Sequence, residues 1–352
     1  MRLTELAVSG GGCGCKIGPA HLSDLLRSFR SDYQNPNWLL VGNEGNEDSA
    51  AFRTPEGQIT LATLDFSPPV VDEAEVWGKI AACNAFSDIF AMGGRPLIAV
   101  AILGFPVDKL DDDTIRSTLE GARQVCTQAK ALMVGGHSIN VSEPIFGLSV
   151  VGTVEEKRVV RNNAASRGDK IFLTKPIGTG VCFSAIRDRD PAINADTNFY
   201  LQVVSNACKL NDFGRTISDI QGITSMTDVT GFGLVGHLHE MMLGCNLTAR
   251  LNISAVPFLD AAVHLSQLGK QTSGTSRNLD YYSKDVRFSS ESDDWRKRLL
   301  FDPQTNGGLL FTAKADAVND VHRIADSQQQ RVYDIGEVVE REQSPLVVFD
   351  AR

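Results

Sequence analysis

The sequence has no long hydrophobic run and no excess of basic residues. Its most apolar stretch, Pro96 to Val107, is shorter than the roughly 20 residues that a membrane-spanning helix needs. The 352 residues contain 34 Lys and Arg against 43 Asp and Glu, which gives a formal net charge of -9. Because binding to a nucleic-acid backbone needs clustered Lys and Arg, we expect no nucleic acid as a partner. The short apolar stretch likewise leads us to expect no membrane as a partner. An acidic protein can still bind a small anion where a metal ion lies between the two negative partners.

Cysteine is scarce as well. Seven cysteines are scattered along the chain, which is too few for a disulfide scaffold. The opening residues, MRLTELAVSGGG, lack the apolar segment of a secretory signal. An odd number of cysteines without an export signal predicts reduced thiols and a cytoplasmic location.

Length and composition indicate a globular protein of two domains, since 42% of the residues are apolar and 22% are charged. In residues 48–154, strand and helix patterns alternate. Predicted helices 73–92 and 112–130 lie among predicted strands 59–66, 96–105, 131–139 and 146–154. This order predicts an α/β (α+β) domain with helices packed on one face of a sheet.

The rest of the chain divides around this domain. Residues 1–47 form an N-terminal segment that we expect to be mobile, and the polar residues 155–169 form a predicted linker. Residues 170–352 predict a second α/β domain. Within it we expect one long helix near 198–220 and a long surface loop over 270–300, where periodicity is weak.

The motif SGGGCGCK, residues 9–16, places two thiols and a lysine in a glycine-rich loop that we expect to be mobile and exposed. Lys16 beside Cys13 and Cys15 is an electropositive setting that favours a thiolate. Three interpretations stay open: a catalytic thiol with a lysine that binds an anion, half of a zinc or soft-metal site, and a flexible terminus with incidental cysteines. The sequence has no second Cys or His pair at zinc-ligand spacing to complete a metal site.

Four aspartates follow strands or lie on one helix. Asp48 and Asp65 come at predicted strand ends, and Asp228 lies in the turn MTDVTGFG. Asp88 lies four residues after Asn84 in a mostly apolar helix, so the two share a face. Each aspartate taken alone is more often a cap, a turn residue or a surface pair. Together they favour a Mg²⁺ site, because magnesium prefers hard oxygen ligands and keeps substrate phosphates in its shell.

Two further motifs are rich in glycine. GFGLVG, residues 231–236, matches G-x-G-x-x-G, but the segment before it is short and polar and no acidic residue ends a following strand. We therefore expect a turn that leads into a helix, and the absence of a Walker A motif excludes a P-loop NTPase. In VGGHSI, residues 134–139, the glycines allow a ligand to approach the backbone beside His137 and Ser138, although a lone histidine is more often structural.

In chain order, these motifs and their spacing closely resemble the selenophosphate synthetase (selenide, water dikinase) family. The resemblance runs from Gly12 to the C-terminus through GGCGCK, LVGNE, NAFSDIFAMGGRP, AILGFP, GGHSI, EPIFGLSVVG, TDVTGFGLVGH and DPQTNGGLL. It implies a two-domain aminoimidazole ribonucleotide synthetase-like fold, in which the N-terminal sheet forms a barrel across a homodimer. It also implies a Mg²⁺-dependent reaction in which ATP, selenide and water yield selenophosphate, AMP and orthophosphate.

The resemblance assigns a role to each matching residue. The implied catalytic residues are Cys13 and Lys16, and the implied magnesium ligands are Asp48, Asp88 and Asp228. The implied ATP contacts are Lys16, Gly45, Asn46, Glu47, Asp65 and Asp88, with Gly136, His137 and Ser138 reaching across the dimer interface. Whether Cys13 delivers selenium, holds it or acts as a nucleophile stays open.

Four positions depart from the family pattern. Leu64 and Cys83 stand where Thr is common, Asn306 stands where Ser is usual, and Ser273 stands where Gly is usual. No departure removes an implied ligand, but the change beside Asp65 bears on the nucleotide contacts there.

Two alternatives remain beside a selenophosphate-forming enzyme. One is another ATP-dependent kinase or synthetase of the same superfamily, against which the CGCK segment argues. The other, from a different class, is a thiol-based selenium or metal carrier. A carrier has no use for four aspartates near strand ends, so the sequence disfavours this alternative.

Overall fold

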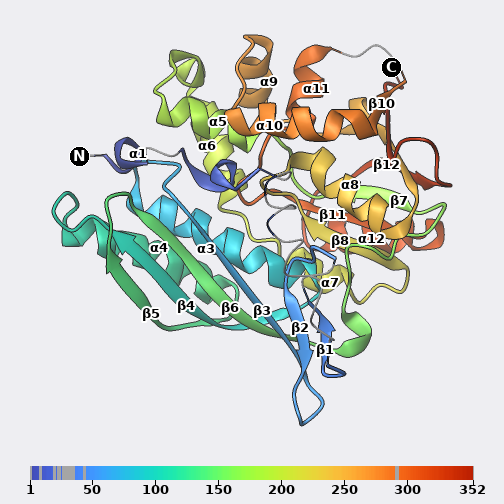
Figure 1. Ribbon diagram of the computed structural model, residues 1–352, viewed down its shortest axis with the longest axis horizontal. Coiled ribbons are helices and arrows are strands. Elements are labelled where there is room, and N and C mark those ends of the chain that lie inside the picture. Colours follow the sequence, from blue (N-terminus) through green and yellow to red (C-terminus); the bar gives the residue numbers. More distant parts are fainter. Residues whose placement is uncertain are drawn as a thin grey trace.

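A computed structural model describes residues 2–7, 10–18, 21, 25, 36–42, 45–289 and 293–351, apart from the side chain of Cys13. The described residues form two sheets, each in its own α/β domain (Figure 1). Among these residues no helix combines the length and the hydropathy that a membrane span needs. The two-domain α/β architecture that the sequence predicts is confirmed.

The N-terminal domain is a six-stranded sheet in the order β1-β2-β3-β6-β4-β5. Its strands are β1 (Leu39–Val41), β2 (Ala50–Arg53), β3 (Ile59–Ser67), β4 (Arg95–Phe105), β5 (Leu132–Asn140) and β6 (Ile145–Val154). Helices α3 (Ala74–Ala91) and α4 (Asp112–Gln128) cover one face (Figure 1). A Cβ at Gly78 would clash with the carbonyl of Thr118, so glycine lets these two helices approach closely. The predicted helices and strands of this domain are confirmed to within two residues at each end.

The C-terminal domain has a seven-stranded sheet in the order β10-β13-β9-β12-β7-β11-β8. Its strands are β7 (Lys170–Leu173), β8 (Ile223–Asp228), β9 (Thr248–Asn252), β10 (Val286–Phe288), β11 (Leu309–Ala313), β12 (Tyr333–Val339) and β13 (Leu346–Phe349). Its helices are α5 (Thr179–Arg187), α6 (Thr197–Ala207), α7 (Phe213–Ile217), α8 (Gly233–Cys245), α9 (Asp260–Gln267), α10 (Ser273–Tyr282), α11 (Asp294–Leu300) and α12 (Val318–Ser327).

The prediction of one long helix over 198–220 is wrong, because the chain forms α6 and α7 with a break between them. At the break, the buried side chain of Asn211 donates to Ser87 Oγ at 2.7 Å and to the Gly307 carbonyl at 2.8 Å. These two partners lie 124 and 96 residues away in sequence. The local helical pattern is therefore overridden by contacts with distant parts of the chain.

The prediction of a long surface loop over 270–300 is also wrong, because this region contains α10, β10 and α11. Thr272 caps α10 by accepting a hydrogen bond from the Thr275 N–H at 2.9 Å. Asn278 is buried and donates to the carbonyls of Gly231 and Phe301. Polar contacts thus hold α10 in place, which a search for apolar periodicity does not detect.

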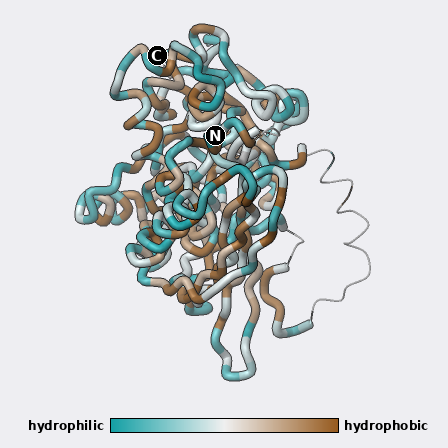
Figure 2. Tube along the Cα trace, turned by 90° about the vertical axis from the view of Figure 1, so that its left-hand side faces the viewer, coloured by the Kyte–Doolittle hydropathy of each residue, from teal (hydrophilic) through white to brown (hydrophobic). Residues whose placement is uncertain are grey.

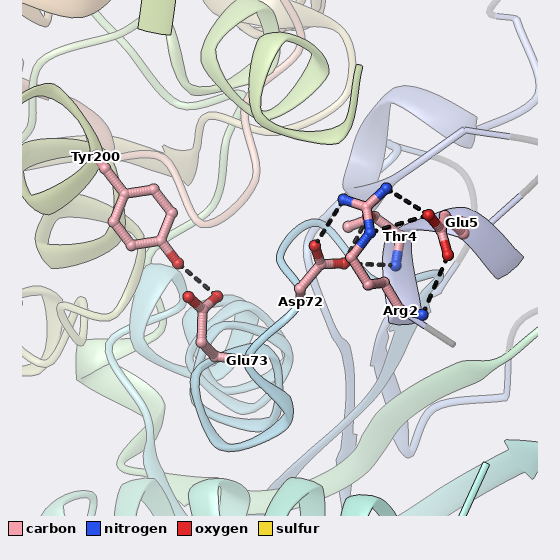
Figure 3. A network of polar contacts seen from close by, with 6 residues as sticks. All are labelled: Arg2, Thr4, Glu5, Asp72, Glu73 and Tyr200. Atoms are coloured by element: carbon pink, nitrogen blue, oxygen red, sulfur yellow. Dashed lines mark hydrogen bonds and ion pairs between the residues drawn. The ribbon is translucent and has the colours of Figure 1, made fainter. Parts of the chain in front are cut away.

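The start of the chain is attached to the N-terminal domain at its junction with the C-terminal domain (Figure 3). Just before and within α1 (Leu3–Leu6), Arg2 and the Thr4 N–H donate to the Asp72 carboxylate at 3.1 and 3.0 Å. On the other side of the junction, the Tyr200 hydroxyl of α6 donates to Glu73 at 2.6 Å. Asp72 and Glu73, between β3 and α3, therefore tie the N-terminal segment and the C-terminal domain to the N-terminal domain.

A shared apolar core fixes how the two domains meet. Phe86 and Ile89 of α3 belong to the same buried cluster as Val181 of α5 and Val203 of α6. Figure 2 shows hydrophobic stretches of the chain running through the middle of the molecule. Because burial of apolar surface is the main favourable term in packing, this continuous core sets the geometry of the junction between the domains.

Asp302 joins two helices of the C-terminal domain to its own loop from a buried position. Its carboxylate accepts hydrogen bonds from the Val181 N–H of α5 at 3.1 Å, Thr275 Oγ1 of α10 at 3.0 Å and Gln304 Nε2 at 3.3 Å. Burial raises the pKa of Asp302 to about 7. Since the folded pKa lies above the unfolded value, the contribution of this group to stability is present at acid pH and is lost as pH rises through about 7.

We expect Asp302→Asn to remove this pH dependence and Asp302→Ala to lower the free energy of unfolding by about 1–3 kcal/mol, since the alanine leaves buried donors without an acceptor. Urea unfolding at pH 5.5 and pH 8 tests both. The stability of the wild type relative to Asp302→Asn should be greater at pH 5.5 than at pH 8. Asp108→Asn, at an exposed aspartate, serves as the control. An equal difference at both pH values would contradict the prediction.

Candidate active site

Three carboxylates from both domains meet at the junction. Asp48 precedes β2, Asp88 lies on α3 and Asp228 ends β8. One carboxylate oxygen from each lies within 4.8 Å of the others. The structure thus brings together the three residues that the sequence pointed to as metal ligands. This trio is called the carboxylate cluster below.

Burial and mutual repulsion govern the charge of the carboxylate cluster. Burial, followed by the negative charge of Asp228, raises the pKa of Asp48 and Asp88 well above the usual range. Burial also raises the pKa of Asp228. Such a group of acids is unfavourable in its ionised form unless a cation joins it.

Hydroxyl groups fix one side of two of these carboxylates. Thr227 Oγ1 donates to Asp48 Oδ1 at 2.8 Å, and Thr63 Oγ1 donates to Asp88 Oδ2. Within the described part of the chain, Oδ2 of Asp48 and Oδ2 of Asp228 are buried and have no hydrogen-bond partner. A buried carboxylate oxygen without a partner is costly, so these two atoms are suited to a hard cation.

Lys16 supplies a nearby positive charge. Its side chain is exposed, and its ammonium acts to lower the pKa of both Asp88 and Asp228. The glycine-rich loop therefore brings its lysine close to the carboxylate cluster. The side chain of Cys13 lies outside the described residues. Cys15 is half-buried, and burial raises the pKa of its thiol.

The glycine-rich loop is packed against both domains, which differs from the exposed loop that the sequence predicts. The Gly12 N–H donates to the Pro68 carbonyl at 3.3 Å. A Cβ at Gly12 would lie 2.7 Å from Val70 Cγ1 and would also clash with Thr305 Oγ1 of the other domain. Arg277 donates to the Gly14 carbonyl at 2.8 Å. Glycine is needed at position 12 because the backbone passes between two packed surfaces and has a φ of 58°, in the left-handed region.

Asp65 lies on β3 and is held by α3. Asn84 Nδ2 donates to Asp65 Oδ2, and Asn84 Oδ1 accepts a hydrogen bond from the Asn306 N–H at 2.6 Å. Asn84 is 5% exposed and Asn306 is fully buried. The shared helix face of Asn84 and Asp88 that the sequence predicts thus serves two aspartates of the site, Asp88 itself and Asp65.

The loop Gly45, Asn46 and Glu47 is held by residues that the sequence did not single out. Asn162, inside the predicted linker, donates from its N–H to Glu47 Oε2 at 2.9 Å and from Nδ2 to the Asn46 carbonyl at 3.0 Å. Asn46 in turn donates to Glu240 of α8 at 3.2 Å, and burial raises the pKa of Glu240 to about 7. A polar residue inside a polar segment gives no distinguishing sequence signal, so the contacts of Asn162 were not predictable.

The strand motif with Gly136, His137 and Ser138 is not brought to the carboxylate cluster of its own chain. These residues lie exposed on β5, the edge strand of the sheet, and β6 and β4 separate β5 from β3. The GFGLVG motif forms a turn that leads into α8, as expected. There, His237 Nε2 accepts the Thr230 N–H at 3.0 Å, and burial lowers the pKa of His237 to about 3, so this histidine is structural.

Family models and curated relatives match nearly the whole chain. Residues 46–154 match the AIR synthase related protein, N-terminal domain, and residues 166–348 match the C-terminal domain. The selenide, water dikinase of Shewanella sp. (strain W3-18-1) is 42% identical over 93% of this chain and 90% of its own length. That of Photobacterium profundum is 41% identical over 99% of this chain and 98% of its own length.

Solved structures show the same fold at lower identity. Thiamine-monophosphate kinase from Stenotrophomonas maltophilia K279a superposes with a TM-score of 0.66 at 19% identity, covering 93% of this chain and 95% of that one. E. coli HypE superposes with a TM-score of 0.63 at 20% identity, covering 92% and 93% of the two chains. These likenesses support the two-domain fold that the sequence predicts.

Proposed function

We propose that this chain, which belongs to the selenide, water dikinase family, forms selenophosphate from selenide, ATP and water. The observation that carries this function is an identity of 40–42% with relatives of that name over more than nine-tenths of the chain. In this reaction one phosphoryl group of ATP passes to selenide, so that a P–Se bond replaces a phosphoanhydride bond. Water cleaves the other anhydride, which leaves AMP and orthophosphate.

The carboxylate cluster fits Mg²⁺, with Asp48, Asp88 and Asp228 as the ligands. The donors are hard oxygens within 4.8 Å of one another, and two of the buried oxygens have no other partner among the described residues. Bound Mg²⁺ supplies neutralisation of the phosphate charge and a fixed orientation of the phosphate oxygens. The raised pKa of these acids is also consistent with a site whose ionised form depends on a bound cation.

The chain's own residues have separate tasks around this centre. Lys16, whose charge already acts on Asp88, binds the transferred phosphoryl group or the incoming selenide anion. Asp65 and the loop from Gly45 to Glu47 contact the nucleotide. Cys13 lies on the same loop as Lys16. Its thiol would deliver selenium, hold it or act as a nucleophile.

Phosphorus NMR of the purified protein with ATP, Mg²⁺ and selenide tests the reaction. We expect selenophosphate, AMP and orthophosphate. ADP with another phosphorylated product would indicate a different kinase or synthetase of the superfamily. Unchanged ATP would indicate a carrier and would contradict the proposed function.

The same assay tests the loop residues. Cys13→Ser and Lys16→Ala should abolish selenophosphate formation without changing the thermal unfolding temperature, because serine keeps nearly the size of cysteine and the Lys16 side chain is exposed. Cys15→Ser is the matched control on the same loop and should keep most of the turnover. Full activity in both Cys13→Ser and Lys16→Ala would contradict the roles proposed for the loop.

Divalent-cation binding tests the carboxylate cluster independently of turnover. Asp228→Asn should weaken Mn²⁺ binding, followed by electron paramagnetic resonance, by about tenfold or more, since it removes one of three charges close to the ion. Asp320→Asn, on α12, changes the net charge by the same amount as Asp228→Asn and should bind Mn²⁺ like the wild type. Equal Mn²⁺ affinity in all three proteins would exclude this site.

We also propose that the outer face of the N-terminal sheet binds a second copy of the chain. Helices α3 and α4 cover the opposite face, whereas Leu64, Phe66, Leu132 and Val134 are 49–69% exposed. A contiguous apolar face of this kind marks an interface. This arrangement would also place the exposed Gly136, His137 and Ser138 of β5 at the dimer contact, in agreement with the family resemblance.

Sedimentation velocity tests the dimer. We expect the wild type to be a dimer and Val134→Glu to be a monomer, because the new carboxylate would be buried without a partner at the interface. Leu201→Glu is the matched control, since Leu201 of α6 is 62% exposed but lies in the other domain. A dimer that persists in Val134→Glu would contradict an interface on this face.

We further place the protein in the cytoplasm. Among the described residues, Cys83, Cys126 and Cys182 are buried thiols that form no disulfide. Thiols outside disulfides are typical of a reducing compartment.

A further inference from the structure

A buried chain of polar contacts runs from the C-terminal domain to Asp65. Lys175, just after β7, donates from Nζ to the Asn306 carbonyl at 3.1 Å. The Asn306 N–H donates to Asn84 Oδ1 at 2.6 Å, and Asn84 Nδ2 donates to Asp65 Oδ2. The contact between Asn306 and Asn84 joins residues 222 positions apart in the sequence.

Asn306 is itself tightly fixed. Its Nδ2 donates to the carbonyls of Ala207 at 2.6 Å and Lys209 at 2.9 Å, at the end of α6. Its φ of 48° lies in the left-handed region, which asparagine tolerates better than most residues. Lys175 Nζ donates to the same Lys209 carbonyl at 2.7 Å. The backbone N–H of Asn306 is therefore aimed at Asn84 by contacts on both of its sides.

The orientation of the Asn84 amide is determined by its two partners. A backbone N–H requires the amide oxygen, and a carboxylate requires the amide nitrogen, so a flipped amide would lose both hydrogen bonds. Lys175, Asn84 and Asn306 are all at most 5% exposed, which strengthens these contacts relative to water. Burial lowers the pKa of Lys175 to about 7, and both of its protonation states keep N–H donors for the two carbonyls.

We infer that Asn84 is a positioning residue that holds the Asp65 carboxylate in its nucleotide-binding orientation, and that Asn306 and Lys175 hold Asn84 from the C-terminal domain. This inference rests on the proposed role of Asp65 in binding ATP. Without Asn84, the Asp65 side chain regains rotamers that do not meet the nucleotide. The C-terminal domain thereby takes part in nucleotide binding through a residue of the other domain.

A double-mutant cycle tests the inference, with binding of a non-hydrolysable ATP analogue in Mg²⁺ measured by calorimetry. We expect Asn84→Ala to raise the Kd about tenfold, the effect of losing one hydrogen bond to a charged group. If Asn84 acts through Asp65, the variant with both Asn84→Ala and Asp65→Ala should bind no more weakly than Asp65→Ala alone. A merely structural role would weaken binding on both backgrounds.

Two further variants keep the result decisive. Asn84→Asp preserves the volume of the side chain and replaces the donor that faces Asp65 with a repelling carboxylate. It should weaken binding at least as much as alanine, and it serves as the test if the loss of buried contacts in Asn84→Ala destabilises the fold. Cys83→Ala is the matched control, since Cys83 is equally buried on the same helix and its thiol donates to the Cys208 carbonyl instead. It should bind the analogue like the wild type.

Three outcomes would overturn the inference. One is wild-type affinity in folded Asn84→Ala and Asn84→Asp, and a second is additive losses in the cycle. The third is wild-type affinity in Asp65→Ala. This last result would remove the nucleotide role of Asp65 itself, whereas the first two would leave that role standing and refute only the positioning by Asn84.

Discussion

Like charges in a buried junction repel one another, and Asp48, Asp88 and Asp228 are held against that repulsion by the packing of both domains. The apolar core that contains both Phe86 of α3 and Val203 of α6 opposes a separation of the two sides. Burial, and after it this repulsion, raises the pKa of the acids, while the domains keep their positions. A site with this property favours a cation over a proton only when the cation offers more charge and more ligand contacts.

The N-terminal segment packs into this junction against both domains. Asp72 fixes its start through Arg2 and Thr4 (Figure 3). Gly12 passes between Val70 of one domain and Thr305 of the other. The loop can lie so close only because it has no side chain at that point. Lys16, four residues later, then brings positive charge to the acids, which eases their repulsion before any cation binds.

Periodicity and spacing predicted much of this arrangement. The strands and helices of the N-terminal domain follow their hydrophobic patterns, and strand ends placed Asp48 and Asp228 together. Contacts between residues far apart in sequence were beyond such reasoning. Asn162 and Asn306 act by hydrogen bonds to residues more than 100 positions away, and each resembles an ordinary turn residue locally. Tertiary partners of this kind leave no periodic trace.

Three of the four departures from the family pattern, at Leu64, Cys83 and Asn306, have physical explanations in these contacts. Leu64 is 54% exposed and alternates with Asp65 along β3, so its side chain lies on the sheet face opposite to the aspartate and leaves the contact between Asp65 and Asn84 unaffected. Cys83 donates its thiol to the Cys208 carbonyl at 3.1 Å, a bond that the hydroxyl of threonine would also make. Asn306 reaches two carbonyls at the end of α6 that the shorter serine side chain would not span, and it tolerates the left-handed backbone better. Asparagine at position 306 therefore adds side-chain hydrogen bonds that fix the residue whose own N–H is directed at Asn84.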